Sequence, residues 1–259
     1  MPGARVKIRA MTIPWENGME PDLFGTRRDE PIGPGAMILR GLASAPEILA
    51  EVERIAALSP FRHMLTPGGR RIGVEMTNCG ALGWVSDRRG YRYEPCDPLT
   101  GRPWPAMPAR FLQLADEAAA RAGFPGFRPD ACLVNRYVPG VKMGLHQDRD
   151  EAGFDAPIVS VSLGLPATFQ FGGPERSDPV AKHVLDHGDV VVWGGPARLA
   201  WHGILTLRRA EHPLTGAARG RSPFTSRSAR GGSRPCRADS GNCPDRRHSS
   251  IAGKRRAAT

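Results

Sequence analysis

The chain has 259 residues, of which 40% are hydrophobic, and carries 36 Lys and Arg against 26 Asp and Glu, so its formal net charge is +10. This composition suffices for one medium-sized domain with a hydrophobic core. No stretch approaches the roughly 18 consecutive apolar residues that a transmembrane helix needs, so a membrane protein is excluded.

The N-terminus and the cysteines indicate the compartment. Met1–Ala10 carries charge but is followed by no apolar run, so it does not read as a secretory signal. The five cysteines are odd in number and scattered, which favours reduced thiols over a disulfide framework: Cys79, Cys96, Cys132, Cys236 and Cys243. We therefore expect a cytoplasmic protein in which residues 1–21 form an N-terminal extension.

Two helices are predicted in the first half of the chain. Ser44 and Glu47 have the spacing of a capping box, and apolar residues then recur on one helical face to about Leu58. A second helix is predicted to begin near Pro108 and to stop at Gly123. Its apolar side comprises Phe111, Leu114, Ala115, Ala118, Ala119 and Ala122. We interpret both helices as packing elements.

From Asp130 onward the pattern changes to short strand-like runs separated by Gly and Pro. The predicted strands are residues 132–137, 158–163, 168–171 and 190–193. Strands that follow one another without intervening helices are typical of a double-sheet architecture. The fold class predicted is therefore α+β, with a jelly-roll (double-stranded β-helix) core and flanking helices.

The last forty residues differ from the rest in composition. Residues 220–259 contain ten Lys and Arg against two Asp, are rich in Ser, Gly and Pro, and have almost no large apolar side chains. Such a segment cannot bury enough surface to offset its ordering entropy, so we predict a disordered basic tail. It could bind phosphate backbones, or it could be solvated without a specific partner. Cys236, Cys243 and His248 lack zinc-finger spacing.

A candidate metal site lies within the strand-rich region. His146 and Asp148 are two residues apart, so in extended backbone they share one side. His202 follows the predicted strand at 190–193 and would complete a 2-His-1-carboxylate triad. That ligand set with open positions is typical of non-haem Fe(II) oxygenases. The alternative is a surface histidine beside a turn aspartate, because His-X-Asp tripeptides also occur by chance.

Several further motifs carry a family resemblance. Around the triad these are Asn135–Asp150, Ala156–Gly164, Phe169–Gly173 and His187–Gly195, and upstream Thr66–Gly69, Met76–Gly80, Leu82–Trp84 and Pro103–Pro108. In this order they closely resemble the bacterial AlkB family of Fe(II)/2-oxoglutarate-dependent nucleic-acid demethylases. The resemblance covers about residues 22–219, which we predict to be the dioxygenase domain.

The resemblance implies a role for each matching residue. His146, Asp148 and His202 would bind Fe(II), with 2-oxoglutarate and O2 as cosubstrates. Asn135 and Tyr137 would help to bind 2-oxoglutarate, and Arg219 would pair with its distal carboxylate, since a buried carboxylate needs a guanidinium and a hydroxyl donor. Otherwise Asn135 and Tyr137 are ordinary strand residues.

Four more residues match positions where the family contacts its substrate: Trp84, Tyr91, Asp150 and Arg176. Trp84 would stack on a flipped base opposite the His146 ring, and Asp150 would accept a hydrogen bond from the exocyclic amine of an alkylated, cationic base. The alternatives are a core tryptophan for Trp84, a solvated carboxylate for Asp150 and a loop cation for Arg176.

The activity implied is oxidative demethylation of 1-methyladenine or 3-methylcytosine in single-stranded or double-stranded DNA, with RNA as a further candidate, by a monomeric enzyme. Formaldehyde, succinate and CO2 are the products. Two alternatives are an Fe(II)/2-oxoglutarate hydroxylase of a substrate other than nucleic acid, and an inactive relative that only binds nucleic acid through its basic tail.

The chain departs from the family at its C-terminal strand. The family reads Arg-X-Asn-X-Thr-X-Arg there, whereas this chain, aligned from Arg219, has Arg221, Pro223 and Thr225 at the next three motif positions. Proline cannot donate to a central sheet ladder, and similarity stops abruptly at Arg219, as after a change of reading frame. We therefore expect a core strand and a second cosubstrate arginine to be missing, which places activity in question.

Overall fold

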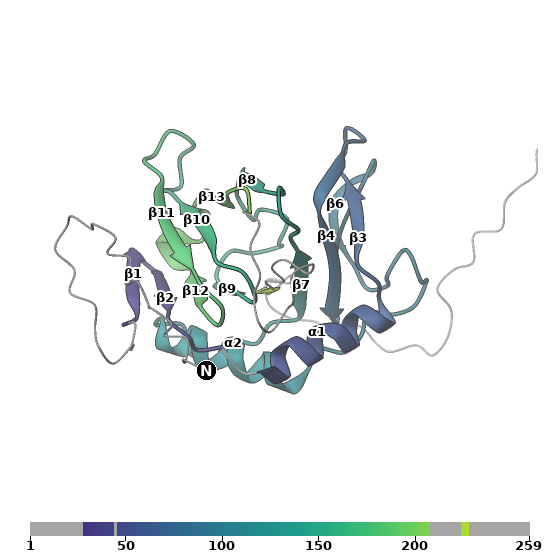
Figure 1. The fold of residues 1–259 in the computed structure, drawn as a ribbon, viewed down its shortest axis with the longest axis horizontal. Helices are drawn as coiled ribbons and strands as arrows, with labels where there is room; N and C mark the ends of the chain where they lie inside the picture. The colour runs from purple at the N-terminus through teal and green to yellow at the C-terminus, as the bar shows by residue number, and fades with distance from the viewer. Residues whose placement is uncertain (1–27, 44–45, 208–223, 228–259) are drawn as a thin grey trace, which may run out of the picture.

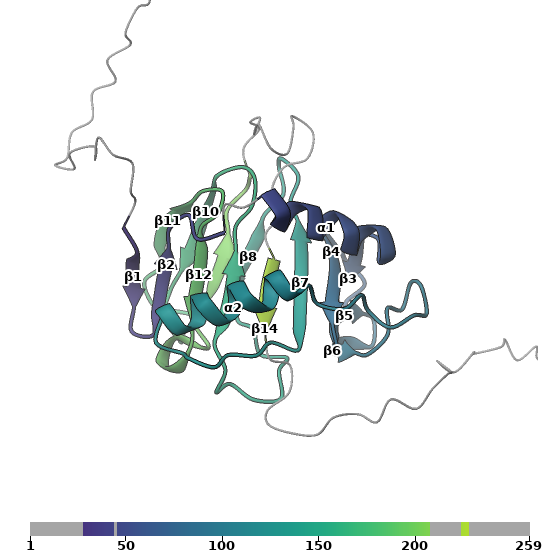
Figure 2. The ribbon, with the colours of Figure 1, turned by 90° about the horizontal axis from the view of Figure 1, so that it is seen from below.

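The computed structural model describes residues 28–43, 46–207 and 224–227, which form two antiparallel sheets with helices against the larger one (Figures 1 and 2). The eight-stranded sheet has the order β1 (Glu30–Gly33), β2 (Ala36–Leu39), β12 (Val190–Trp193), β9 (Ile158–Val161), β14 (Phe224–Arg227), β7 (Ala131–Arg136), β4 (Arg71–Gly80) and β3 (Arg62–Leu65). The four-stranded sheet has the order β11 (Ala181–Leu185), β10 (Ala167–Phe171), β13 (His202–Ile204) and β8 (Met143–His146). A separate hairpin pairs β5 (Gly83–Asp87) with β6 (Gly90–Glu94).

Both predicted helices are confirmed. They are α1 (Pro46–Leu58) and α2 (Ala109–Arg121), and they lie across one face of the eight-stranded sheet (Figure 2). Their buried residues fall on the predicted apolar faces: Ile48, Val52 and Ile55 in α1, and Phe111, Leu114, Ala115, Ala118 and Ala119 in α2. The Ser44 of the expected capping box lies outside the described residues.

Four predicted strands are confirmed within two residues at each end, as β7, β9, β10 and β12. Six strands upstream of Asp130, β1 to β6, were not predicted. The longest of these, β4, is exposed at its beginning and buried on both faces toward its end. It therefore lacks the regular polar and apolar alternation by which a half-buried strand is recognised.

Aromatic side chains fill one part of the space between the two sheets. Phe169 and Phe171 of β10 pack against Trp193 of β12, with ring centroids 6.2 Å apart in both pairs. All three side chains are buried, and burying each apolar side chain of this size contributes roughly 1.5–3 kcal/mol. This cluster supports β10, and with it the neighbouring strand β13 that carries a predicted metal ligand.

The prediction of disorder for residues 220–259 is wrong at Phe224–Arg227, which form β14 in the middle of the large sheet. There the strand pairs with β7 on one side and with β9 on the other. Strand β14 begins one residue after Pro223, so the proline does not interrupt the ladder. Backbone hydrogen bonding to two otherwise open strand edges requires no apolar composition, which is why composition misled the prediction. The other residues of 220–259 lie outside the described residues.

Among the helices that the structure describes, none combines the length and hydropathy that crossing a membrane requires.

Candidate metal centre and substrate cavity

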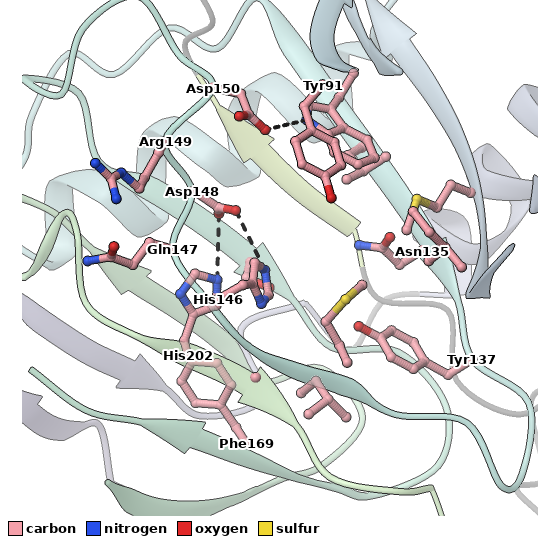
Figure 3. A pocket seen from close by; sticks show the side chains of 18 of the residues that line it. Tyr91, Asn135, Tyr137, His146, Gln147, Asp148, Arg149, Asp150, Phe169 and His202 are labelled. Atoms are coloured by element: carbon pink, nitrogen blue, oxygen red, sulfur yellow. Dashed lines mark hydrogen bonds and ion pairs between the residues drawn. The ribbon is translucent and has the colours of Figure 1, made fainter. Parts of the chain in front are cut away.

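The three predicted metal ligands meet at one point of the four-stranded sheet. His146 ends β8 and His202 begins β13, and the two residues are directly paired across these neighbouring strands. The carboxylate of Asp148 faces both rings: its oxygens are 3.7 Å from Nε2 of His146 and 3.6 Å from Nε2 of His202 (Figure 3). The three donor atoms lie within 4.8 Å of one another. The structure therefore brings the predicted triad together.

Backbone carbonyls hold both histidine rings in the orientation that metal binding needs. Nδ1 of His146 is 2.9 Å from the carbonyl oxygen of Gly144, and Nδ1 of His202 is 2.9 Å from that of Ala200. A carbonyl can only accept, so each Nδ1 carries the proton and each Nε2 presents its lone pair toward Asp148. Two such nitrogens and one carboxylate match the facial triad of non-haem iron, so the residues present fit Fe(II).

The triad lies in a cavity of about 540 Å³ between the sheets. The ligands differ in accessibility: the side chains of Asp148 and His202 are 6% and 8% exposed, whereas that of His146 is 38% exposed. His146 therefore forms the open side of the centre. A cavity of this volume is typical of a site for small organic ligands.

The inner wall of the cavity carries the two residues predicted to contact 2-oxoglutarate. Asn135 on β7 and Tyr137 just after it both line the cavity and are 7% and 3% exposed (Figure 3). The Oδ1 atom of Asn135 is buried and has no hydrogen-bond partner among the described residues. A polar ligand in the cavity would satisfy it. Arg219, the third predicted cosubstrate residue, lies outside the described residues.

The outer wall is formed by the β5–β6 hairpin. Trp84 of β5 and Tyr91 of β6 stack with ring centroids 5.6 Å apart and an interplanar angle of 16°. Nε1 of Trp84 donates a hydrogen bond of 2.8 Å to Asp150, and all three residues line the cavity. Figure 3 shows Tyr91 and Asp150 on this wall. The alternative of a core tryptophan does not hold, because Trp84 is only partly buried and borders the cavity.

Comparison with known proteins decides the family. The model of the 2OG-Fe(II) oxygenase superfamily matches residues 35–232. The chain is 56% identical to the alpha-ketoglutarate-dependent dioxygenase AlkB of Escherichia coli (strain K12) over 198 residues, which are 75% of this chain and 92% of that protein. The chain belongs to the AlkB family of 2OG-Fe(II) oxygenases. Its cofactor is therefore Fe(II), and its cosubstrates are 2-oxoglutarate and O2.

Two further comparisons agree with the AlkB family. The alpha-ketoglutarate-dependent dioxygenase AlkB homolog of Caulobacter vibrioides (strain NA1000 / CB15N) is 44% identical over 200 residues, which are 76% of this chain and 89% of that protein. A solved structure titled "The structure of OsALKBH1" superposes with a TM-score of 0.69 at 28% identity, covering 78% of this chain and all of that one. The fold is thus that of a 2OG-Fe(II) oxygenase.

Arg176, the last residue predicted to contact substrate, is not among the residues that line the cavity of this AlkB-family chain. It is exposed, and its guanidinium lies 4.5 Å from the ring centroid of Trp201. The loop that carries it is held near the metal centre, because Gln147 donates to the carbonyl oxygen of Pro174 at 3.0 Å. Arg176 therefore lies beside the site, and its contact with substrate remains a prediction.

Sequence reasoning missed a buried ion pair behind the metal centre. Arg198 and Glu151 are 3% and 6% exposed, and their charged atoms lie 3.4 Å apart. Tyr93, on the same hairpin as Trp84, donates a hydrogen bond of 2.9 Å to Glu151. The one available signal was position, because Glu151 follows the Asp148 segment and Arg198 precedes His202 by four residues.

Another buried carboxylate, Asp97, lies just after the end of the hairpin, on the side that leads away from the cavity. It accepts hydrogen bonds from Ser59 at 2.5 Å and from Arg62 at 3.0 Å. Burial raises the pKa of Asp97, but the hydrogen bonds from Ser59, the Leu99 amide and Arg62 outweigh it, so the pKa lies below its usual value. The carboxylate is thus held ionised where the chain leaves β6.

Proposed function

We propose that this chain demethylates N-alkylated nucleic-acid bases, namely 1-methyladenine and 3-methylcytosine in DNA, and also in RNA. One observation carries the proposal: the stacked pair of Trp84 and Tyr91 borders the same cavity as the metal triad, with Asp150 fixed beside it. The relatives support nucleic acid as the substrate class, since proteins of Arabidopsis thaliana and Mus musculus are named DNA N(6)-methyladenine demethylase ALKBH1C and Nucleic acid dioxygenase ALKBH1.

The metal supplies the oxidising chemistry. When bound with 2-oxoglutarate and O2, Fe(II) allows hydroxylation of the N-methyl carbon, and the hydroxymethyl group then leaves as formaldehyde while 2-oxoglutarate becomes succinate and CO2. His146, Asp148 and His202 hold the ion on one face and leave positions open for cosubstrates. The protein contributes positioning and electrostatics rather than a nucleophile.

The outer wall selects and orients the base. A base inside a duplex must leave the stack before its methyl group can reach the metal, and an aromatic face replaces the stacking that it loses. Trp84 offers that face, and the partly exposed ring of His146 lines the same cavity. Asp150 carries a negative charge that complements a cationic methylated base, and its carboxylate accepts from the exocyclic amine.

For the 2-oxoglutarate carboxylates we propose Arg227 in addition to the predicted Arg219. Thr225 of β14 pairs with Leu133 and with Ser160, both of which line the cavity. Arg227, two residues further along β14, pairs with Ala131 of β7. Shifted by two residues, the family motif Arg-X-Asn-X-Thr-X-Arg matches this chain at Arg221, Thr225 and Arg227, with Pro223 in place of Asn.

The two arginines are distinguished by substitution. A charge-assisted hydrogen bond contributes roughly 1.5–3 kcal/mol, so Arg227→Gln should raise the dissociation constant of 2-oxoglutarate about tenfold to a hundredfold. Titration of 2-oxoglutarate into anaerobic, metal-loaded protein measures it, with Arg219→Gln as the matched variant. An unchanged constant in Arg227→Gln would remove Arg227 from the cosubstrate site.

Several finer features of the protein belong to the same proposal. The two facing sheets support the jelly roll expected from the sequence, and the dioxygenase domain predicted over residues 22–219 extends at least through β14. A monomeric, cytoplasmic enzyme remains a prediction.

The deciding experiment offers Fe(II)-loaded protein a methylated single-stranded oligonucleotide with 2-oxoglutarate and O2. Formaldehyde and succinate formed in equal amounts are expected. Succinate without formaldehyde would favour a hydroxylase of another substrate, and salt-sensitive binding without succinate would favour an inactive nucleic-acid-binding protein. Either result would overturn the proposal.

A further inference from the structure

Three consecutive residues between β12 and β13 each contact a different part of the ligand-bearing segments. Nη1 of Arg198 donates to the backbone oxygen of Asp148 at 3.0 Å. The carbonyl oxygen of Leu199 accepts from the Gln147 side chain at 2.5 Å, and that of Ala200 accepts from His202 at 2.9 Å. One short segment thus holds the chain at Asp148 and orients His202.

Arg198 makes two further contacts from the same guanidinium. Its Nε donates to the carbonyl oxygen of Ala156 at 3.0 Å, so Arg198 joins both ends of the loop that leads from Asp148 to β9. Its Nη2 pairs with Glu151 in the middle of that loop. The planar, forked guanidinium can serve three acceptors at once, which a lysine ammonium on a flexible stem cannot reproduce.

The ion pair is shielded from water. The side chains of Arg198 and Glu151 are 4% and 0% exposed, and the ring of Phe154 lies 5.3 Å from the guanidinium. A buried charge left without its partner is strongly unfavourable, so this pair fixes the loop far more firmly than a surface pair would.

The same loop connects the metal centre to the substrate wall. Glu151 accepts a hydrogen bond from Tyr93 of β6, and Asp150 accepts one from Trp84 of β5. A displacement of the loop would therefore move Asp148 and the hairpin together.

We propose that Arg198 is a positioning residue with two effects. It holds Asp148 in metal-binding geometry, and through Glu151 and Tyr93 it fixes the distance between the aromatic hairpin and the metal. The second effect rests on the proposed function, whereas the first concerns metal binding alone.

Metal binding tests the first effect. Arg198→Lys in the full-length protein is titrated with Co(II), whose visible d–d absorption reports ligand geometry. Loss of an outer contact to a metal ligand typically costs about 10- to 100-fold in affinity, so we expect a rise of that size in the Co(II) dissociation constant and a changed spectrum.

The matched control is Arg62→Lys. Arg62 also pairs with a buried carboxylate, Asp97, at 2.8 Å, and it lies 5.2 Å from the Trp104 ring, away from the metal. We expect Arg62→Lys to lower the melting temperature. Its Co(II) affinity should stay within about twofold of the native value, well below the roughly 10- to 100-fold loss expected when a contact to a metal ligand is removed. If Arg198→Lys lowers the melting temperature and leaves Co(II) affinity and spectrum unchanged, Arg198 has a structural role only and the proposal fails.

Glu151→Gln tests the same ion pair if Arg198→Lys does not fold. It keeps the volume of the side chain and removes only its charge, so we expect a severalfold weaker Co(II) affinity. An affinity equal to that of the native chain would contradict the role of the ion pair.

Tyr93→Phe tests the link to the hairpin. It removes the hydroxyl that contacts Glu151 and should raise the KM for a methylated oligonucleotide severalfold while leaving Co(II) affinity unchanged. An unchanged KM would overturn this second effect. If the native chain releases no formaldehyde at all, the proposed function fails, and the Co(II) comparison still decides the first effect.

Discussion

The metal-bearing wall of the cavity and the β5–β6 wall opposite it differ in how they are attached to the molecule. His146 and His202 lie on paired strands of the four-stranded sheet, which packs on the aromatic cluster of Phe169 and Trp193. The hairpin is a separate two-stranded sheet. Near its start, the Asn78 side chain makes two hydrogen bonds of 3.0 Å with the backbone of Trp84.

This difference corresponds to two chemical tasks. A metal centre requires donor atoms at fixed distances, which buried, layered packing provides. A surface that receives a base needs an accessible aromatic face, and Tyr91 is 47% exposed at this position. The metal ligands and the aromatic face of one site are thus placed on different sheets. Substitutions on the two walls separate these tasks.

The largest effect is expected from His202→Ala, which removes a ligand from the metal-bearing wall. Losing a residue that only contacts a metal ligand can already weaken metal binding about a hundredfold, so the dissociation constant for Fe(II) or Co(II) should rise by well over that factor. Anaerobic metal titration measures it. Binding of a methylated oligonucleotide to the metal-free protein should be preserved. Retained metal affinity would show that the three side chains do not form one site.

Asp97→Asn acts at the base of the hairpin without touching the metal. Breaking a buried ion pair costs roughly 3–5 kcal/mol, and denaturant unfolding at pH 7 should show a loss toward the lower end of that range because asparagine keeps the shape. The lowered pKa of Asp97 means that its stabilisation is complete above the unfolded-state value of about 4 and is lost as pH falls toward the folded-state pKa. The variant should therefore lose less stability than the native chain on acidification. If the unfolding free energies of the two proteins fall equally steeply as the pH is lowered, this expectation is contradicted.

Trp84→Ala removes the aromatic face from the β5–β6 wall. Stacking of a base on an aromatic side chain contributes roughly 1–3 kcal/mol, so the KM for methylated single-stranded DNA should rise about fivefold to 150-fold. Steady-state formaldehyde release measures the KM, and Co(II) titration serves as the control. An equal loss of metal affinity would mean that the two walls are not separable.

The smallest effect is expected from Asp150→Asn. The amide oxygen can still accept from Trp84, so the hairpin stays attached, but the negative charge opposite a cationic base is lost. The amide oxygen can also still accept from the exocyclic amine, so only the charge assistance is lost, roughly 1 kcal/mol or about fivefold in catalytic efficiency. The ratio of rates on 1-methyladenine in the two proteins measures it. A comparable loss of 2-oxoglutarate binding would refute the assignment of Asp150 to substrate.

The sequence predicted those parts of the site that depend on local spacing. His146 and Asp148 share a side because extended backbone alternates, and both helices follow from an apolar stripe with a period of 3.6 residues. His202 was assigned to the triad from its residue type and then from the motif resemblance, but its pairing with His146 is long-range, and neither source predicted it.

The rest could not be predicted for physical reasons. Arg198 and Glu151 have the composition of surface residues, and their burial depends on partners that are distant in sequence. Strand β14 was missed because it pairs with β7 and β9, two strands that are distant from it in sequence. Strands β1 to β6 show no regular alternation long enough to separate them from loops.

The place of β14 also has a consequence for the order of folding. Strands β7 and β9 are synthesised well before β14, yet in the large sheet they are joined only through it. Until that strand is inserted, each half of the sheet exposes an edge with unpaired backbone groups, which can pair with another chain. Contacts between distant segments also close slowly. Refolding should therefore show a late phase in which the sheet centre closes, and aggregation should compete with folding during the interval before it.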